Sequence, residues 1–155
     1  MKSREVKAPL NLHIEQRESE GIVILDLKGH LTLGAGDLEL RDKLVALHQS
    51  GEINIVLNLK GVGEIDSTGL GTLVFGLARL TKAGGKLALA NVDKKHLQLF
   101  VLTRLAIAFE FFEDVHDAVD SFFPDRALKR FDILNFVQTE QDRSTNPGAG
   151  IEAAC

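Results

Sequence analysis

The sequence contains no tryptophan and no tyrosine, and its single cysteine is the last residue, Cys155. Tryptophan and tyrosine form most stacking platforms for sugars and bases and many interface anchors, so we expect the 9 phenylalanines to fill the core instead. One cysteine excludes an intramolecular disulfide and supplies at most one ligand of a zinc site. This cysteine usage indicates a reducing compartment.

Long apolar runs and an excess of positive charge are also missing. No run approaches the roughly 18 apolar residues of a membrane span, and residues 1–7 carry charges where a secretory signal would be apolar. Lys+Arg 18 against Asp+Glu 22 leaves a formal net charge of -4, without the basic field that attracts nucleic acids. We therefore expect a cytoplasmic protein with no membrane span, no direct nucleic-acid contact, and protein or small-molecule partners.

The 155 residues, 45% of them hydrophobic, are enough for one globular domain with its own core. Apolar and polar residues alternate over 10–16, which predicts a strand with one exposed face. A turn at 18–21 is followed by a nearly continuous β-branched run over 22–27, which predicts a strand buried on both faces. We expect these two strands to form a hairpin.

Helical spacing appears next. Asp37 is placed to cap a helix whose apolar face holds Leu40, Leu44 and Leu47, and Gly51 suits the position just past its end. A strand over 53–59 and a glycine-bearing loop precede a second helix, which ends at 84–85. The apolar face predicted for this second helix consists of Leu70, Val74, Leu77 and Thr81.

The rest of the domain repeats this alternation. We predict a strand over 86–91, a helix from the cap Asp93 to about Arg104, and a strand over 107–112. Asp114 opens a last helix whose apolar face continues to Phe123, and Pro124 blocks its extension. The order ββαβαβαβα predicts an α/β domain over residues 8–123, with a mixed sheet of about five strands and about four helices.

Residues 124–155 form a C-terminal extension in this interpretation. Apolar spacing predicts a helix over 126–137, and the polar, small residues that follow predict a disordered tail. Phe131, Leu134 and Phe136 would be exposed together on a free helix. We therefore expect 126–137 to pack on the domain or to swap into a second chain and form a homodimer, with cover of a sheet edge as a further alternative.

The densest candidate for function is residues 61–71, Gly-Val-Gly-Glu-Ile-Asp-Ser-Thr-Gly-Leu-Gly, between a buried strand and an amphipathic helix. Functional groups collect at this end of the strands in α/β sheets. Asp66, Ser67 and Thr68 are each candidates for the helix cap. Gly69 and Gly71 keep the first turn free of bulk, so another backbone or an anionic group can approach its N–H groups.

Enzyme motifs do not fit these residues. The dinucleotide fingerprint lacks its third glycine, where Val74 stands, and the P-loop lacks its hydroxyl residue, where Leu87 stands. The nucleophile elbow needs glycine at Ile65, two residues before Ser67. An enzyme that uses Asp66 and Ser67 is therefore disfavoured, and no catalytic residue, metal site or cofactor is predicted.

Leu57-Asn-Leu59, followed by Ile-Asp-Ser-Thr-Gly-Leu-Gly at 65–71, resembles the phosphorylation-site signature of the bacterial anti-sigma factor antagonists, members of the STAS domain family. The resemblance extends to the element order, to the 29–37 loop and to Gly-Gly-Lys-Leu at 84–87. It covers roughly residues 10–123 and implies a single STAS-like domain, with the extension outside the family pattern.

The resemblance also implies a function. In that family the serine after the aspartate is phosphorylated by a partner that is both anti-sigma factor and serine kinase, and a serine phosphatase removes the phosphate. By motif position this serine is Ser67, with Thr68 as the local competitor. The unphosphorylated form binds the anti-sigma factor and frees the sigma factor. The implied role is regulation of transcription by partner switching, as a kinase substrate and not an enzyme.

The implied interface combines the 29–37 loop, the 66–71 turn and the adjoining helix. Its candidate partner-binding residues are Thr32, Asp37, Asp66, Ser67, Thr68, Gly69, Leu70 and Gly71. A second interpretation keeps the fold but makes the protein a regulatory or scaffold STAS subunit of a stress-signalling complex or a transporter assembly. The motif alone does not separate the two.

Overall fold

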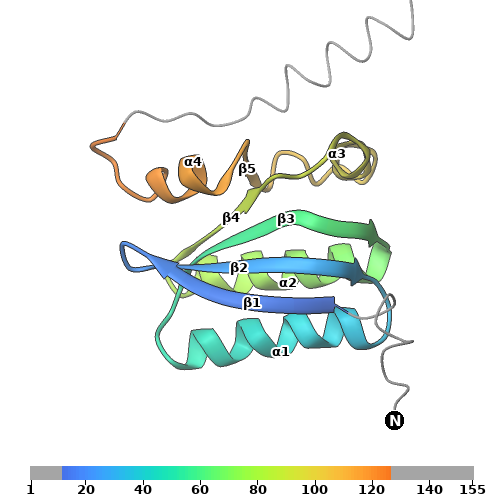
Figure 1. The fold of residues 1–155 in the computed structure, drawn as a ribbon, viewed down its shortest axis with the longest axis horizontal. Coiled ribbons are helices and arrows are strands. Elements are labelled where there is room, and N and C mark those ends of the chain that lie inside the picture. The colour runs from blue at the N-terminus through green and yellow to red at the C-terminus, as the bar shows by residue number, and fades with distance from the viewer. Residues whose placement is uncertain (1–11, 127–155) are drawn as a thin grey trace, which may run out of the picture.

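The computed structural model describes residues 12–126 (Figure 1). Its elements are β1 (Leu12–Ser19), β2 (Ile22–Leu31), α1 (Ala35–Gln49), β3 (Asn54–Ile65), α2 (Ser67–Lys82), β4 (Lys86–Ala90), α3 (Lys94–Leu102), β5 (Glu110–Phe112) and α4 (Val115–Asp120). The predicted order ββαβαβαβα and the α/β fold are confirmed. The predicted helix over 126–137 lies outside the described residues except for Arg126, and so does the tail.

The five strands form one mixed sheet in the order β1-β2-β3-β4-β5. β1 and β2 are antiparallel and form the predicted hairpin, whose turn holds Glu20 and Gly21 at positive φ. β2 to β5 are parallel to one another, and a helix connects each to the next. The carboxyl ends of these four strands therefore meet at one edge of the sheet.

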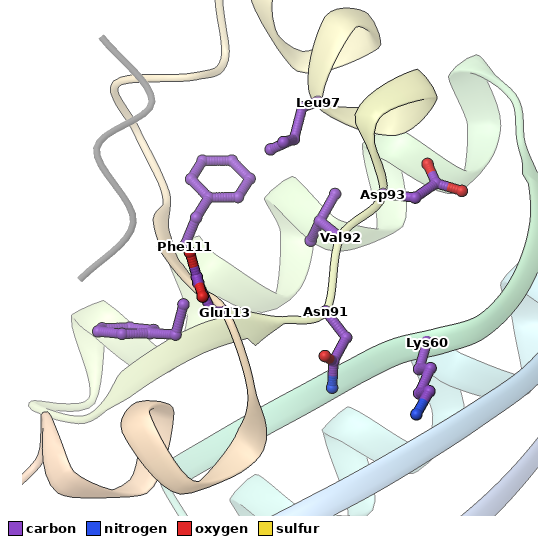
Figure 2. A pocket seen from close by; sticks show the side chains of 8 residues that line it. Lys60, Asn91, Val92, Asp93, Leu97, Phe111 and Glu113 are labelled. Carbon is purple, nitrogen blue, oxygen red and sulfur yellow. The ribbon is translucent and has the colours of Figure 1, made fainter. Parts of the chain in front are cut away.

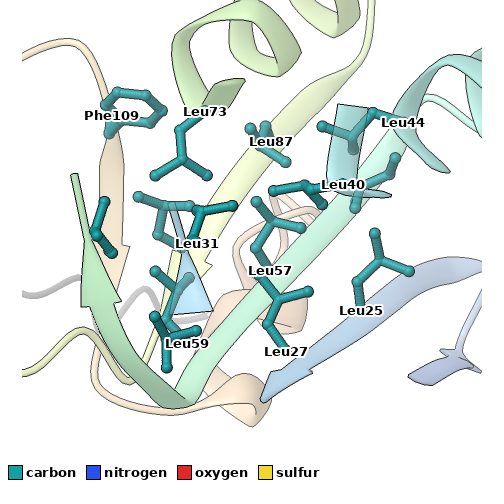
Figure 3. Packing of buried hydrophobic residues seen from close by; sticks show 14 of the residues in the cluster. Leu25, Leu27, Leu31, Leu40, Leu44, Leu57, Leu59, Leu73, Leu87 and Phe109 are labelled. Atoms are coloured by element: carbon teal, nitrogen blue, oxygen red, sulfur yellow. The ribbon is translucent and has the colours of Figure 1, made fainter. Parts of the chain in front are cut away.

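Helices cover the two faces of the sheet unequally. α1 and α2 lie on one face, while α4 lies on the other (Figure 1). The buried apolar residues form two cores, a larger one that includes α1 and α2 and a smaller one under α4. Leu25 and Leu57 face the larger core, with Leu40 of α1 and Leu73 of α2 packed against them (Figure 3). β2 also sends Ile24 to the smaller core under α4. Since both faces of β2 meet apolar side chains, the prediction of a doubly buried strand is confirmed.

Phenylalanine fills the core beside α3, as the absence of tyrosine and tryptophan predicts. Phe100 of α3 is fully buried and packs edge-to-face on Phe109 and Phe111, with ring centroids 5.3 and 5.1 Å away. The caps predicted for two helices are also confirmed. Asp93 accepts the His96 N–H at the start of α3, and Asp114 accepts the Asp117 N–H at the start of α4.

β3 is longer than predicted, because the glycine-bearing stretch after residue 59 continues the strand to Ile65. Its register against β2 shifts twice, between Asp26 and Lys28 and again between Gly29 and His30. A side chain at Gly61 would place its Cβ 2.9 Å from the Leu27 carbonyl oxygen. Glycine thus permits close strand pairing at an irregular point, where the sequence alone favours a loop.

The buried face of α2 also differs from the predicted one. Leu70 is buried as expected, but Val74 and Thr81 are exposed and Leu77 is only partly buried. The buried positions are Gly69, Leu70, Thr72, Leu73, Gly76 and Leu80. A Cβ at Gly76 would lie 2.7 Å from Cδ1 of Leu44, so small residues let α1 and α2 approach closely. The predicted face is therefore right for Leu70 and wrong for Val74 and Thr81, because small residues form half of the buried face.

Two elements near the C-terminal end of the described chain are shorter than predicted. β5 has only the three residues Glu110–Phe112, and Ile107 in the preceding turn is 81% exposed. α4 ends at Asp120, so Phe122 and Phe123 lie beyond the helix, although both pack against the smaller core. Within residues 12–126 no helix is long and apolar enough to cross a membrane.

Candidate functional site

The candidate residues lie where β2 and β3 end at the same edge of the sheet. Leu31 and Ile65, the last residues of the two strands, are paired in register. The β2–α1 loop with Thr32 follows the first strand, and Asp66 with α2 follows the second. The topology therefore brings the 29–37 loop next to the 66–71 turn, as the interface hypothesis requires.

Asp66 is the residue that caps α2, among the three cap candidates. One carboxylate oxygen, Oδ1, accepts the Gly69 N–H at 2.8 Å. The other, Oδ2, accepts the Leu33 N–H at 2.9 Å. Both oxygens of one side chain are thus bonded to backbone groups of different segments, so Asp66 joins the start of α2 to the β2–α1 loop.

The environment of Asp66 favours its ionised form. Burial alone would raise the pKa of the carboxyl, but hydrogen bonds from the backbone N–H groups of Leu33 and Gly69 and from neighbouring N–H groups outweigh burial, so the pKa of Asp66 is lowered. A negative charge at the N-terminus of α2 also interacts favourably with the helix dipole. The carboxylate is therefore a fixed anion beside Ser67.

We expect Asp66→Ala to destabilise the protein by about 2 kcal/mol, because it removes a cap and the bond to Leu33 together. Asp66→Asn is the matched variant, since asparagine caps a helix but does not titrate.

The ionised carboxyl of Asp66 also makes stability depend on pH. Because its pKa is lowered in the folded state, it stabilises the fold above the unfolded-state pKa of about 3.9. This contribution is lost as the pH falls through the folded-state pKa. Below about pH 4, the melting temperature of the wild type should therefore fall more steeply with decreasing pH than that of Asp66→Asn. Parallel pH curves would contradict this role.

Gly69 and Leu70 hold the site in place from the inside. Gly69 is buried, and a Cβ there would lie 2.0 Å from the Leu31 carbonyl oxygen. Leu70 is 4% exposed and belongs to the larger core. Both candidate residues therefore fix the first turn of α2 against the end of β2, and neither presents a side chain to a partner.

Ser67 is the exposed hydroxyl residue of the motif. It occupies the first position of α2, directly after the cap. Gly71 and Val74 follow at i+4 and i+7, both exposed, so the three share one face of the helix. A Cβ at Gly71 would meet nothing within 4 Å. No side chain at position 71 therefore covers the surface next to Ser67, and a partner can approach the hydroxyl there.

Thr68 is less accessible than Ser67. Its side chain is half-buried, and its carbonyl accepts the Thr72 hydroxyl at 3.3 Å within the first turn of α2. A kinase acts on a hydroxyl that it can surround. Exposure therefore favours Ser67 over Thr68 as the acceptor.

Asp37 does not cap α1, so this prediction was wrong. The cap is Gly34, whose φ of 116° and ψ of -134° are accessible to glycine. α1 consequently begins earlier than predicted, and Asp37 is its third residue, where its carboxylate accepts the Gly34 N–H at 2.8 Å. Asp37 also donates its N–H to the Thr32 carbonyl at 3.1 Å. Thr32 and Asp37 thus shape the loop beside Asp66.

Two exposed leucines belong to this edge and were not among the predicted residues. Leu33, whose N–H bonds to Asp66, is 76% exposed, and Leu38 in the first turn of α1 is 55% exposed. Exposed large apolar side chains near a polar motif are typical of protein-binding surfaces. The signal in the sequence was a leucine inside a predicted loop, at a position with no helix or strand face to bury it.

α3 adds a cation to the same edge. Lys95 Nζ donates to the Gly63 carbonyl at 2.9 Å and lies 3.8 Å from the Glu64 carboxylate. These residues precede Asp66 by only two or three positions. The side chain of Lys95 therefore joins α3 to the end of β3, just before the motif.

One cluster within residues 12–126 has the residue types of a metal site. The ligand atoms of Asp114, His116 and Asp117 lie within 4.8 Å of one another. Asp114 and His116 are exposed, and Asp114 Oδ1 already accepts the Asp117 N–H at 2.8 Å as the cap of α4. Exposed acidic groups at a helix start are common without metal, and this cluster supports no cofactor assignment.

Comparisons with known proteins agree with this architecture. Residues 13–118 match the profile of the STAS domain. The chain is 31% identical over 96 residues to the anti-sigma-B factor antagonist of Bacillus subtilis. These aligned residues make up 62% of this chain and 86% of that protein. A solved anti-sigma factor antagonist from Mycobacterium paratuberculosis superposes with a TM-score of 0.66 at 19% identity, over 74% of this chain and 96% of that one.

The Bacillus protein SpoIIAA shows the same fold in two chemical states. Its unphosphorylated form superposes with a TM-score of 0.58 at 19% identity, over 71% of this chain and 97% of that one. Its phosphorylated form superposes with a TM-score of 0.57 at 20% identity, over 71% and 99%. The two forms of SpoIIAA therefore resemble this chain equally well in fold.

Proposed function

Because the chain belongs to the STAS domain family, we propose that it acts as an anti-sigma factor antagonist. Its unphosphorylated form binds an anti-sigma factor that is also a serine kinase, and this binding releases a sigma factor. The protein then regulates transcription in the cytoplasm by partner switching, without touching DNA, and serves as a substrate and not as an enzyme. The name of the Bacillus subtilis relative and the order of the elements support this role.

The observation that carries the proposal is the position of Ser67. It is the exposed first residue of α2, beside the fixed carboxylate of Asp66 and the exposed Leu33. Partners that surround this edge would contact the hydroxyl directly. Ser67 is therefore the proposed phosphate acceptor, and a serine phosphatase would restore the binding form.

The fold can accept a phosphate at this position. A phosphoserine adds about −1.5 to −2 charges, and the dipole at a helix N-terminus favours anions. SpoIIAA, which shares the fold, has been solved in its phosphorylated form. The effect of phosphorylation is thus expected at the surface, where added bulk and charge next to Asp66 would oppose a partner, and not on stability.

The proposed interface has a polar centre and an apolar margin. Asp66, Ser67 and Gly71 supply the centre, and Leu33 and Leu38 supply exposed apolar surface near it. The remaining candidates, Thr32, Asp37, Thr68, Gly69 and Leu70, support the backbone that presents these groups.

Phosphate mapping tests the assignment. Incubation of the full chain with its cognate anti-sigma kinase and ATP should place one phosphate on the peptide that contains Ser67. Ser67→Ala should abolish labelling, while Thr68→Ala, the matched control, should retain it. Label that persists in Ser67→Ala and disappears in Thr68→Ala would reassign the acceptor.

The alternative role, as a regulatory or scaffold STAS subunit of a stress-signalling complex or transporter assembly, predicts other partners. A pull-down from the source cell with and without ATP distinguishes the roles. Recovery of a small ATP-binding kinase that ATP releases supports the antagonist, whereas recovery of transporter subunits or a stable assembly supports the alternative.

A further inference from the structure

A pocket of about 360 Å³ lies where β4 and β5 end, apart from Ser67 (Figure 2). Val92 of the β4–α3 loop, Leu97 of α3 and Phe111 of β5 give it an apolar lining. Asn91 enters it from the end of β4 and is held in a left-handed conformation, φ 59°, with its amide bonded to Asn58. Crevices outside the carboxyl ends of parallel strands are where such sheets bind ligands.

Charged groups of both signs surround this lining. Figure 2 shows Lys60 and Glu113 on opposite sides of Asn91, and Asp93 at the start of α3 is also part of the wall. Among residues 12–126, no group pairs with the Lys60 ammonium or the Glu113 carboxylate. A complementary ligand carries an apolar group, cations for the two carboxylates, which flank the lining on opposite sides, and an anion for Lys60.

The chain itself contains such a sequence shortly after the described residues. Lys129, Arg130, Phe131 and Asp132 are consecutive, with two cations before an aromatic ring and a carboxylate after it. The cations match Glu113 and Asp93, the ring matches the lining, and the carboxylate matches Lys60. No other four consecutive residues between 127 and 155 combine two cations, an aromatic ring and an anion in this order.

The described chain ends close enough for this segment to reach the pocket. Arg126 NH1 donates to Asp120 at 2.8 Å, and the guanidinium also pairs with Glu20, so the exit point is held at the end of α4. α4 has six residues and is roughly 9 Å long, and its other end begins two residues after Glu113. Phe131 is five residues beyond Arg126, a span of up to roughly 17 Å when extended. The segment can therefore return along α4 to the pocket.

We propose that residues 129–132 dock into this pocket of their own chain, with Phe131 against the apolar lining, the two cations facing Glu113 and Asp93, and Asp132 facing Lys60. The proposal gives the C-terminal extension a defined binding site. It does not depend on the function proposed for Ser67, because none of the lining residues belongs to that site.

A disulfide trap in the full chain tests this docking. In a Cys155→Ser background, Glu113→Cys is combined with Arg130→Cys, and dilute protein is treated with oxidised glutathione. The matched control combines Glu18→Cys with Arg130→Cys. Glu18 is also exposed and lies two residues from Glu20, roughly 7 Å from the exit point. It is therefore nearer to the exit point than Glu113 is, and tether length alone would favour the control pair. We expect the 113–130 disulfide to form about tenfold faster or more, within one chain.

Phe131→Asp added to the 113–130 pair should reduce its rate to that of the control pair, while Ile151→Asp, a similar change in the tail, should leave the rate unchanged. Equal rates for the 113–130 and 18–130 pairs would overturn the proposal. So would a 113–130 disulfide that forms only between two chains, because the occupant would then be a second copy.

Discussion

Replacement of Gly69 by alanine should destabilise the protein by about 3 kcal/mol or more, which is a large share of a domain's stability. The added Cβ would lie 2.0 Å from the Leu31 carbonyl oxygen and 2.9 Å from its carbon. Both are backbone atoms of the fully buried Leu31, so no change of side-chain rotamer can relieve the clash with the new Cβ. Chemical denaturation monitored by circular dichroism measures the change in the free energy of unfolding.

Gly71→Ala is the matched control, two residues along the same helix. A Cβ at this position meets nothing within 4 Å, so the free energy of unfolding should stay the same or rise by up to about 1 kcal/mol. Equal stability of the two alanine variants would show that α2 does not approach β2 as closely as described.

Substitution of Ser67 by glutamate should weaken binding to the anti-sigma factor about a hundredfold, which corresponds to about 2.8 kcal/mol. The substitution adds bulk and a negative charge beside the Asp66 carboxylate, whose two oxygens are fixed by Leu33 and Gly69 and cannot turn away. Desolvation of two adjacent like charges in an interface costs several kcal/mol. Titration calorimetry with the purified partner gives the affinity.

Ser67→Ala and Thr68→Glu separate this effect from a general loss of fit. Alanine removes the hydroxyl without adding charge, so affinity should stay near that of the wild type. Glutamate at Thr68 adds the same charge one residue away, on a half-buried position, and should weaken binding less than Ser67→Glu. A Ser67→Glu affinity equal to that of Ser67→Ala would contradict the proposed role of charge.

The fold could be predicted from the sequence wherever apolar residues follow a period or an aspartate starts a helix. The doubly apolar run of β2 and the caps Asp93 and Asp114 are examples. Prediction failed where glycine decided the structure. Gly61 continues β3, Gly34 starts α1 before Asp37, and Gly76 forms part of the buried face of α2. Glycine has no side chain to show a periodicity, so only the tertiary contacts reveal its role.

The sequence predicted which segment forms the candidate site, but it did not predict which other residues lie on the same surface. The motif placed Asp66 and Ser67 at the start of a helix, and the structure shows this arrangement. The bond from Leu33 to Asp66 joins residues 33 positions apart, so no local pattern indicates it. The exposure of Leu33 and Leu38 likewise depends on which side of the loop and of α1 faces the sheet.

The most direct test of the account compares the affinity of one purified anti-sigma factor for the unphosphorylated chain and for the chain phosphorylated at Ser67. We expect tight binding of the unphosphorylated form, binding about a hundredfold weaker after phosphorylation, and recovery after treatment with a serine phosphatase. Equal affinities of the two forms would contradict partner switching at Ser67.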